Sequence, residues 1–383
     1  MAAVVKIALV CDWYAPRLGG IETQLSDLAT TLRARGHEVH VVTATPGPIA
    51  RGVHRLAVPL VPGWRVAGSR RALDALHALF ARESYDVIHA HSLYSPLAHA
   101  ATYLGRLIGV PSILTSHSLV DRASALLLRA FVPDWAAWPA RLSAVGSLAA
   151  AELERMSGRG DVALLPNGID AARFAAPPRL ASETITIASV LRLHARKRPL
   201  ALVRALPDVL RRAQAHCLDR RVRLVLCGDG PLAGAVRAEA VRLGVADHVE
   251  LRGAVARDAI PAILAAADLF ALPSVNEAFG IVALEARAAG LPVVAMRAGG
   301  AAELVEHGRD GLLAEDDDEL AAQLGTLVVD HALRRRMHEA APRRLERYAW
   351  SAVAARHEAL YQSLAATPPA LAIPAGTYAR RAA

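Results

Sequence analysis

Short apolar runs alternate with helical patterns along most of the sequence, and this alternation restricts the fold more than any other feature. Such a pattern is typical of parallel β-sheets, because two parallel strands need a long crossover connection that is usually a helix. In the first half, helical segments are expected over residues 21–35, 69–82, 96–108 and 147–156. The predicted strands there are KIALV, EVHVVT, VHRLAVP, DVIHAH, PSILTS, LSAVG and VALLP.

A second series with the same alternation follows NGIDAARFAAPPRLASE, a stretch rich in turn-forming residues that we interpret as a linker. Its predicted strands are TITIASV, VRLVLCG, HVELRG, LFALPS, PVVAM and GLLAE, and helices are expected, for example, over 198–212 and 231–243. The sequence therefore predicts an α/β protein with two Rossmann-like, doubly wound domains, residues 1–170 and 180–345, that face a cleft. We expect residues 346–365 to form a helix that packs back on the first domain, and residues 366–383 to be a disordered tail.

The composition excludes several classes of protein. Apolar residues make up 54% of the chain, which excludes a largely disordered protein. No uninterrupted apolar run reaches the length of a transmembrane helix, roughly 20 residues. Lys6 interrupts the apolar N-terminus, so a first buried strand is favoured over a signal peptide. Cys11, Cys217 and Cys227 are far apart, which predicts no disulfide framework and a cytoplasmic location.

The net charge of +8 fits two interpretations: a solvated basic surface, or attraction to an anionic partner such as a nucleotide diphosphate or an anionic membrane surface. Aromatic residues are only 4% of the chain, and no nucleic-acid-binding motif is present. Stacking platforms for bases are therefore not expected, and we predict no nucleic-acid partner.

The stretch ALPSVNEAFGIVALEARAAGLPVVA, residues 271–295, predicts a strand, a loop, a helix and a second strand. Glu277 would lie at the carboxyl edge of the sheet, where open α/β sheets bind ligands. The helix is expected to begin near Phe279 or Gly280, so that its free N–H groups face the same region. Glu285 is expected in its second turn, away from the core. Either glutamate alone has an ordinary explanation in the helix dipole or an exposed position. Together, the unit offers backbone donors for a phosphate and two carboxylates for sugar hydroxyls.

This stretch resembles the Glu-x7-Glu region of retaining glycosyltransferases of family four, the group 1 glycosyl transferases, which have the two-domain GT-B fold. Further motifs resemble the family in order: LGGIETQLSDLATTLRARGHEVHVVT, DVIHAHS, ILTSHS, LLPNGID, VLRLHARKRP and LVLCGDGP. The resemblance spans about residues 5–362. The stretch HAHSLYSPLAHAATYLGRLIGVPSILTSHSL is also similar to part of the enzymes that glycosylate phosphatidylinositol.

The resemblance implies roles for particular residues. Glu277 and His117 would be the catalytic residues, with Glu277 on the hydroxyls of the transferred sugar and His117 facing the sugar from the first domain. Cations in the VLRLHARKRP loop would stabilise the departing diphosphate, and Glu285 would hold ribose hydroxyls. The residues that the resemblance assigns to donor binding are Gly19, Gly20, Arg192, Lys197, Phe279, Gly280, Ile281 and Glu285.

The implied activity is transfer of a hexose or N-acetylhexosamine, with retention of configuration, from a nucleotide diphosphate sugar of the UDP or GDP type. The acceptor would be a hydroxyl on a glycan or lipid, and the family pattern implies no cofactor and no metal. His89, His91 and His99 lie near one another in the sequence, but no carboxylate or cysteine completes a metal-binding set.

Two positions depart from the family pattern. Leu191 stands where glycine usually precedes the arginine of the donor loop, so its isobutyl group is expected to narrow the approach of a phosphate. Arg287 replaces a small or sulfur-containing residue and is expected at the surface of the helix that carries Glu285. The acidic run Glu315–Glu319 is predicted to cap a helix rather than bind a metal.

Three alternatives stay open at this point. Residues 118–142 fit a core helix followed by a loop, which we favour, or a segment that lies on a membrane surface. A nucleotide-sugar 2-epimerase shares the two-domain architecture but needs further acid and base carboxylates. A degenerate, non-catalytic GT-B partner is suggested only by Leu191.

Overall fold

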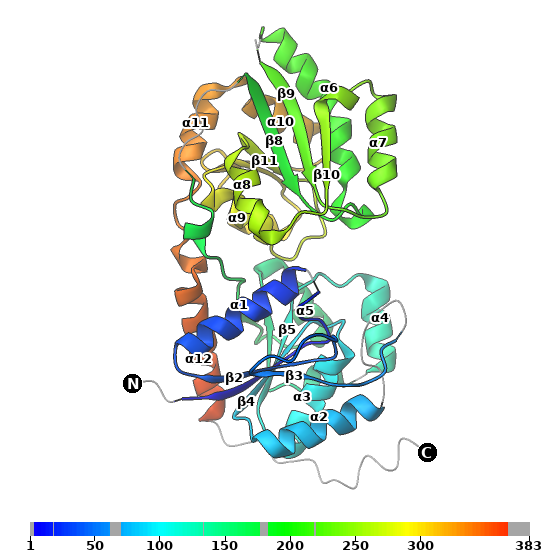
Figure 1. Cartoon of the computed structure of the whole chain (residues 1–383), viewed down its shortest axis with the longest axis vertical. Coiled ribbons are helices and arrows are strands. Elements are labelled where there is room, and N and C mark those ends of the chain that lie inside the picture. Colours follow the sequence, from blue (N-terminus) through cyan, green and yellow to red (C-terminus); the bar gives the residue numbers. More distant parts are fainter. Residues whose placement is uncertain are drawn as a thin grey trace. The chain divides into compact units, whose positions relative to one another are not determined.

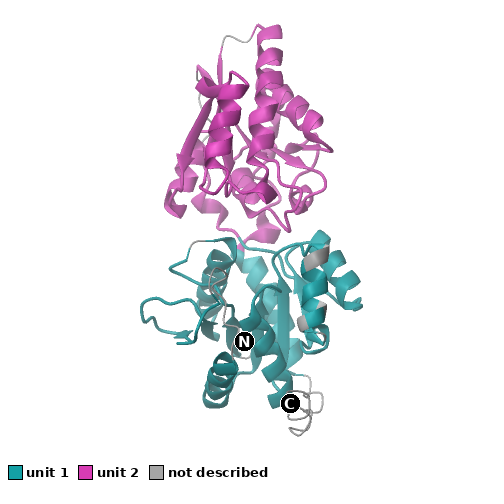
Figure 2. Ribbon diagram, turned by 90° about the vertical axis from the view of Figure 1, so that its right-hand side faces the viewer, with its two compact units in different colours: residues 1–168, 350–383 teal, residues 169–349 magenta. Residues whose placement is uncertain are grey.

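The structure is a computed structural model of the 383-residue chain that describes residues 4–17, 19–61, 70–132, 134–176, 183–217 and 220–366. The chain divides into two compact units (Figure 2). Unit 1 comprises Met1–Gly168 and Trp350–Ala383, and unit 2 comprises Ile169–Ala349.

Unit 1 contains a parallel sheet that, over the described residues, has seven strands in the order β3-β2-β1-β4-β5-β6-β7 (Figure 1). The strands are β1 Lys6–Val10, β2 Glu38–Thr43, β3 Val53–Arg55, β4 Val87–His91, β5 Ser112–Ser116, β6 Arg141–Ala144 and β7 Ala163–Leu164. The α-helices are α1 Gly20–Ala34, α2 Arg70–Glu83, α3 Pro96–Ile108, α4 Arg122–Phe131, α5 Ser147–Ser157 and α12 Trp350–Ala365, and Trp135–Ala137 forms a 3-10 turn.

Helix α3 shows how local chemistry fixes the ends of an element. The Ser95 side chain accepts a hydrogen bond from the Ala98 amide, Pro96 occupies the first turn, and Gly109 ends the helix with a left-handed φ of 77°. A serine at the start of a helix accepts a bond from an otherwise unpaired N–H group, and a proline there has the helical φ and no N–H to leave unpaired. A glycine suits the end of the helix because it adopts the left-handed φ needed there.

Helix α12 completes the core of unit 1, although it follows all of unit 2 in the sequence. Its residues Ala354 and Tyr361 are fully buried in a cluster with Leu25 and Ala29 of α1. Glu358 accepts hydrogen bonds from Arg35 Nε and Nη2 at 2.5 and 2.7 Å. The final helix is therefore fixed to unit 1 by both apolar packing and a charged pair.

Unit 2 contains a second parallel sheet, which in the described residues has the order β10-β9-β8-β11-β12-β13. Its strands are β8 Thr184–Val190, β9 Arg221–Cys227, β10 Val249–Gly253, β11 Leu269–Leu272, β12 Val293–Met296 and β13 Gly311–Ala314. Its α-helices are α6 Pro199–Ala215, α7 Ala233–Arg242, α8 Ile260–Ala265, α9 Ile281–Ala288, α10 Asp317–Val329 and α11 His331–Ala340. The 3-10 turns are η2 Ala171–Arg173, η3 Ala195–Lys197, η4 Ala246–His248, η5 Arg257–Ala259, η6 Gly300–Leu304 and η7 Glu346–Tyr348.

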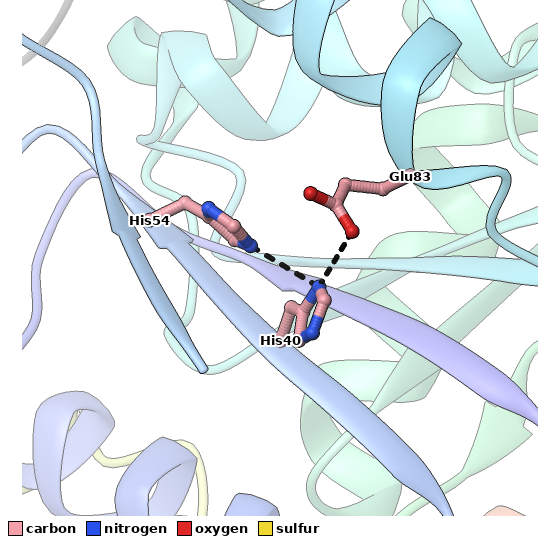
Figure 3. A group of neighbouring side chains, drawn as sticks. All are labelled: His40, His54 and Glu83. Carbon is pink, nitrogen blue, oxygen red and sulfur yellow. Dashed lines mark hydrogen bonds and ion pairs between the residues drawn. The ribbon is translucent and has the colours of Figure 1, made fainter. Parts of the chain in front are cut away.

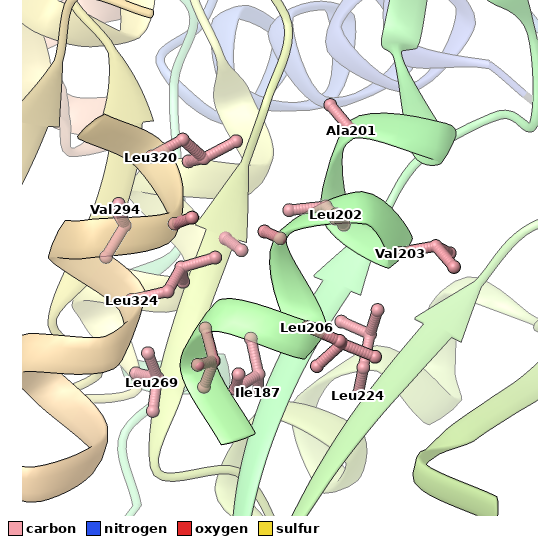
Figure 4. Close-up of a cluster of buried hydrophobic side chains, with 14 of the residues drawn as sticks. Ile187, Ala201, Leu202, Val203, Leu206, Leu224, Leu269, Val294, Leu320 and Leu324 are labelled. Atoms are coloured by element: carbon pink, nitrogen blue, oxygen red, sulfur yellow. The ribbon is translucent and has the colours of Figure 1, made fainter. Parts of the chain in front are cut away.

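The core of unit 2 lies between its sheet and the neighbouring helices α6 and α10 (Figure 4). Leu202 and Leu206 come from α6, and Leu320 and Leu324 come from α10. The strand order of this sheet is that of a Rossmann fold, so ligand-binding loops are expected beyond the carboxyl ends of the strands.

The predicted α/β class with two Rossmann-like sheets is confirmed. The strand predicted as VHRLAVP is shorter than expected and ends at Arg55, and β7 spans only Ala163–Leu164. The capping role of the acidic run is also confirmed, because the Asp316 side chain accepts from the Glu319 amide at 2.8 Å. The predicted disordered tail lies almost wholly outside the described residues. Among the described helices, none combines the length and apolar character that crossing a bilayer requires.

Candidate functional site

Two of the predicted site residues meet at the carboxyl edge of the unit 2 sheet. Strands β8 and β11 are parallel neighbours, so the loops that follow them leave the sheet side by side. Lys197 Nζ, from the first loop, lies 2.5 Å from Glu277 Oε2, from the second, and both side chains remain partly exposed. The structure thus holds a cation and a carboxylate together where Rossmann-like sheets bind their ligands.

Arg198 fixes the loop that carries Lys197. It adopts a left-handed conformation with φ 54° and occupies the N-cap position of α6, without a side-chain capping bond. Its Nη1 donates to the Pro273 carbonyl at 2.9 Å, and its Nη2 bonds to Asp317. Sequence reasoning did not assign this residue a role, although the proline that follows it marks a helix start.

Arg192 lies in the same loop but in a different environment. It is exposed, and its guanidinium makes no ion pair or hydrogen bond with any residue that the structure describes. Lys197 is neutralised by Glu277, whereas Arg192 presents an uncompensated charge. An anion at this edge therefore meets Arg192 without first breaking an ion pair.

The isobutyl group of Leu191 was expected to narrow the approach of a phosphate, and this expectation is wrong. The side chain is buried in the core of unit 2 rather than placed over the donor loop. The backbone of this loop instead packs against the loop after β9: a Cβ on Gly228 would lie 1.9 Å from the Leu191 carbonyl oxygen. Gly228 also has a φ of +139°, so glycine is required there on both grounds.

Helix α9 begins at Ile281, one residue after Gly280, close to where the sequence predicted it. Phe279 is buried and its ring meets Tyr348 edge-on at 5.7 Å, so the ring packs in the core and only its backbone is a candidate for ligand contact. The first N–H groups of α9, including that of Ile281, have no partner within the helix. They lie one residue beyond the positive φ of Gly280, which is +87°.

Gly280→Ala is expected to destabilise unit 2 by roughly 1–2 kcal/mol, because an alanine there must adopt a left-handed conformation. Its Cβ would also lie 2.8 Å from the Ala301 Cβ. Gly234→Ala is the matched control, since nothing lies within 4 Å of its added Cβ and it is in helix α7. Urea unfolding followed by circular dichroism measures the stability of both variants. Equal unfolding midpoints would contradict the expectation that alanine is strained at position 280.

Glu285 and Arg287 correct two expectations about α9, because both side chains are buried, at 8% and 4% exposure. Arg287 Nη2 lies 2.7 Å from Asp310 Oδ2 and 3.1 Å from the Arg343 carbonyl oxygen, and Nη1 bonds to Leu304 O. Burial lowers the pKa of Arg287 and raises that of Asp310. The physical reason is that α9 is covered by η6 as well as by the sheet, so it has little solvent-facing surface.

Unit 1 holds the partly buried His117 beside the buried histidines His89, His91 and His357. His117 Nε2 lies 3.0 Å from His91 Nδ1. His89 contacts Tyr361 Oη and Thr115 Oγ1, each at 2.6 Å. A cavity of about 20 Å³, room for about one water molecule, is lined by Gln24, His91, Thr115, His117, Asn167 and His357, among others. Sequence reasoning missed His357, which lies far from the other histidines in the sequence.

His89, His91 and His99, which are near one another in the sequence, do not converge on one point in the structure. His99 Nε2 bonds to the Leu93 carbonyl at 2.9 Å and does not join the other two in a convergent set. His91 Nε2 is buried and has no partner in the part of unit 1 that the structure describes. It belongs instead to the residues that line the small cavity.

Gly19 and Gly20 mark the start of α1 in unit 1, with Gly19 before the helix and Gly20 as its first residue. A Cβ on Gly19 would lie 2.2 Å from Glu22 Oε2. Glu22 in turn pairs with Arg17 at 3.0 Å. A carboxylate therefore lies against the backbone that was expected to approach a phosphate, and Arg17 compensates its charge.

We expect the stability of unit 1 to fall as the pH is lowered from about 7 to 5.5. Burial lowers the pKa of His117 and of His357 from 6.5 to about 4. Below pH 6.5 the unfolded chain therefore binds protons that the folded chain does not, so stability decreases by up to about 1.4 kcal/mol per pH unit for each histidine.

All five tryptophans of the chain lie in unit 1, so urea unfolding followed by tryptophan fluorescence measures this effect. His357→Gln should flatten the pH dependence, and His77→Gln, at an exposed position, should leave it unchanged. An unfolding midpoint that does not move between these pH values would contradict the expectation.

Comparison with known proteins places the chain in a family. Residues 171–344 match the model described as Glycosyl transferases group 1, and residues 18–173 match Glycosyltransferase Family 4. The D-inositol 3-phosphate glycosyltransferase of Corynebacterium jeikeium is 31% identical over 92% of this chain and 93% of the relative. The phosphatidyl-myo-inositol mannosyltransferase of Mycobacterium leprae is 28% identical over 94% of this chain and 97% of the relative.

Solved structures agree with the fold. Sucrose-phosphate synthase from Thermosynechococcus elongatus superposes with a TM-score of 0.76 at 22% identity, covering 94% of this chain and 99% of that one. Alr3699/HepE of Anabaena, in complex with UDP and glucose, gives 0.75 at 24% identity, covering 94% and 100%. On the family matches and the two Rossmann-like sheets together, the chain belongs to glycosyltransferase family 4 and is a glycosyltransferase of the GT-B fold.

Proposed function

We propose that the protein transfers a hexose or N-acetylhexosamine from a nucleotide diphosphate sugar to a hydroxyl of an inositol-containing acceptor, with retention of anomeric configuration. The observation that carries the proposal is the Lys197–Glu277 pair at the carboxyl edge of unit 2, in the same loop region as the exposed Arg192. Curated relatives named for phosphatidylinositol or inositol phosphate support the acceptor. Anabaena HepE, solved with UDP-glucose, supports a nucleotide sugar as donor.

In this proposal the ion pair exchanges partners when the donor binds. The diphosphate gains negative charge as the glycosidic bond breaks, and Lys197 and Arg192 stabilise that charge. Charge-assisted hydrogen bonds of this kind contribute about 1.5–3 kcal/mol each. Once Lys197 turns to phosphate, the Glu277 carboxylate accepts hydrogen bonds from the sugar hydroxyls. Lys197 and Glu277 thus neutralise each other until the donor supplies a new partner for each.

The chemistry we propose is front-side substitution. The bond between the anomeric carbon and the diphosphate oxygen breaks, and the acceptor oxygen forms its bond on the same face. The acceptor proton passes to the departing diphosphate oxygen. Unit 2 contributes orientation and charge stabilisation through Lys197 and Glu277, and His117 of unit 1 is proposed to act on the transferred sugar.

The test is a thermal-shift screen with UDP, GDP and their sugars, followed by product analysis with inositol 3-phosphate and phosphatidylinositol. A donor at about 100 times its Kd should stabilise the protein by about 2.7 kcal/mol. We expect one donor class to bind and its sugar to appear on the acceptor with the donor's configuration by NMR. An inverted product would contradict retention, conversion of the donor without acceptor would indicate an epimerase, and no binding of any nucleotide would indicate a non-catalytic partner.

We also propose that the protein acts in the cytoplasm, bound peripherally to the inner face of the membrane. The net charge of +8 and the exposed Leu126 and Leu127 of α4 support this. Trp135, from the same 118–142 segment, is buried, so it takes no part in such binding.

The protein is expected to co-sediment with vesicles that contain anionic lipid at low salt and to dissociate at high salt, because screening weakens charge attraction. Replacing Leu126 and Leu127 with glutamine should reduce the bound fraction. Val241→Gln, at a similarly exposed apolar position in unit 2, is the control. Failure to bind at low salt would contradict the membrane proposal while leaving the glycosyltransferase proposal intact.

A further inference from the structure

A separate group of polar side chains converges in unit 1, on elements that carry none of the residues discussed above for sugar transfer. His40 comes from β2, His54 from β3, and Glu83 is the last residue of α2 (Figure 3). One donor atom from each lies within 4.8 Å of those of the other two. Within the described residues, this is the one set of three histidine, cysteine or carboxylate side chains that converges in this way.

The distances suit a small metal ion. His40 Nδ1 lies 3.1 Å from His54 Nε2 and 3.8 Å from Glu83 Oε2. Around a tetrahedral ion with bonds of about 2.0–2.1 Å, neighbouring ligand atoms are about 3.4 Å apart, a value between these two. The third pair of ligand atoms, from His54 and Glu83, lies within 4.8 Å, so the side chains would need to shift to surround one ion.

The surroundings of His40 favour metal binding through its Nδ1 atom. Its other nitrogen, Nε2, lies 3.5 Å from the Glu38 carboxylate, an arrangement that leaves Nδ1 to the metal and that often supports metal-binding histidines. Tyr85 Oη lies 2.9 Å from His40 Nδ1, a hydrogen bond that a metal at Nδ1 would replace.

Cations already contact Glu83 and would compete with a metal. Lys6 Nζ lies 3.3 Å from Glu83 Oε2 and 2.8 Å from Glu38 Oε1. Arg82 Nε lies 3.1 Å from Glu83 Oε1, the other oxygen. A bound ion would displace only the longer of the two Lys6 contacts, because Lys6 keeps Glu38 and Arg82 keeps the second oxygen of Glu83.

We propose that His40, His54 and Glu83 form a binding site for a divalent transition-metal ion of intermediate softness, such as Zn²⁺. Two imidazole nitrogens and one carboxylate oxygen are a donor set that Zn²⁺ accepts in four-coordinate geometry. The ion would join the edge strand β3 to β2 and to the end of α2. The site is a structural one, and it is independent of the donor-binding residues of unit 2.

The experiment uses full-length, tag-free protein treated with a chelator, with Cys217→Ser to remove an exposed thiol that could bind metal by itself. Titration with Co²⁺ should give the visible bands of a four-coordinate ion at one equivalent, and Zn²⁺ should abolish them. His54→Gln and Glu83→Gln should each weaken binding by at least about 10-fold. His77→Gln, at an exposed position on α2, should bind like the parent.

A further variant tests the competition with Lys6. Lys6→Gln should tighten Co²⁺ binding, because the ammonium no longer competes for Glu83. Circular dichroism of each variant shows whether it is folded. The proposal is overturned if the parent shows no four-coordinate bands, or if folded His54→Gln binds Co²⁺ as tightly as the parent does.

Discussion

Lys197→Met is expected to lower kcat by roughly 10²–10³-fold, the usual cost of removing one fixed charge that stabilises a developing anion. Lys197 Nζ lies 2.5 Å from Glu277 Oε2, so the side chain is already held at the carboxyl edge of the sheet. The ion pair is partly exposed, and such pairs contribute at most about 1 kcal/mol to folding. The variant should therefore lose turnover without losing its fold.

Arg196→Met is the matched control for this experiment. Arg196 is the residue before Lys197, is exposed, and carries the same formal charge. Its replacement should change kcat by less than about threefold, since an exposed charge is screened by salt. Steady-state kinetics with the donor identified by the binding screen measures both variants.

Equal losses in Arg196→Met and Lys197→Met would mean that the general positive field of the loop matters, rather than one positioned cation. The double variant Lys197→Met with Glu277→Gln adds a second check. If the two side chains act on one bound donor, their combined effect on kcat/KM should be smaller than the product of the single effects.

Arg287→Met is expected to destabilise unit 2 by about 3–5 kcal/mol, because it leaves the buried Asp310 carboxylate without its countercharge. Arg287 and Asp310 are each about 5% exposed at the side chain. The variant also removes the donors to the carbonyls of Leu304 and Arg343. Few surface substitutions would have an effect of this size.

The distribution of tryptophan gives this measurement an internal reference. Unit 2 has no tryptophan in its sequence, so tryptophan fluorescence reports on unit 1 and far-ultraviolet circular dichroism reports on both units. In urea, Arg287→Met should shift the dichroism transition to lower concentration while the fluorescence transition stays in place. A shift of both by the same amount would indicate that the units unfold together.

The variant Arg287→Met with Asp310→Asn is the control for the charge argument. It removes both charges, and the asparagine oxygen can still accept from the Glu306 amide, as Asp310 Oδ1 does at 2.7 Å. We expect the double variant to be more stable than Arg287→Met alone. If it is less stable, the buried charge is not the main cause of the loss.

The elements of the fold could be predicted well because their signals are local. Helix α3 was expected over residues 96–108, and the structure has Pro96–Ile108, since proline and glycine mark its two ends. Strand β8 coincides with the predicted TITIASV, because this run of apolar and β-branched residues lies between turn-forming residues. The shorter β3 and β7 lie toward the two edges of the unit 1 sheet, where pairing on one side does not fix a strand's length.

The surroundings of single side chains were less predictable, because they depend on segments distant in the sequence. Arg287 was expected at the surface of the helix that carries Glu285. Its burial depends on Asp310 and the backbone of Leu304, which the sequence of α9 does not reveal. The family resemblance names both Lys197 and Glu277 as site residues, but their contact follows from the pairing of β8 with β11. The same limit applies to His40 and Glu83, which only the folded sheet brings together.

The return of α12 to unit 1 has a consequence for how the chain is made. Synthesis proceeds from the N-terminus, so all of unit 2 is made before the α12 residues that complete unit 1. Until then the apolar face of α1 around Leu25 and Ala29 lacks Ala354 and Tyr361, which cover it in the final structure. Unit 2 can therefore complete its core first, while unit 1 still exposes apolar surface of the kind that chaperones bind. A chain that ended just before α12 would contain all of unit 2 but would lack part of the core of unit 1.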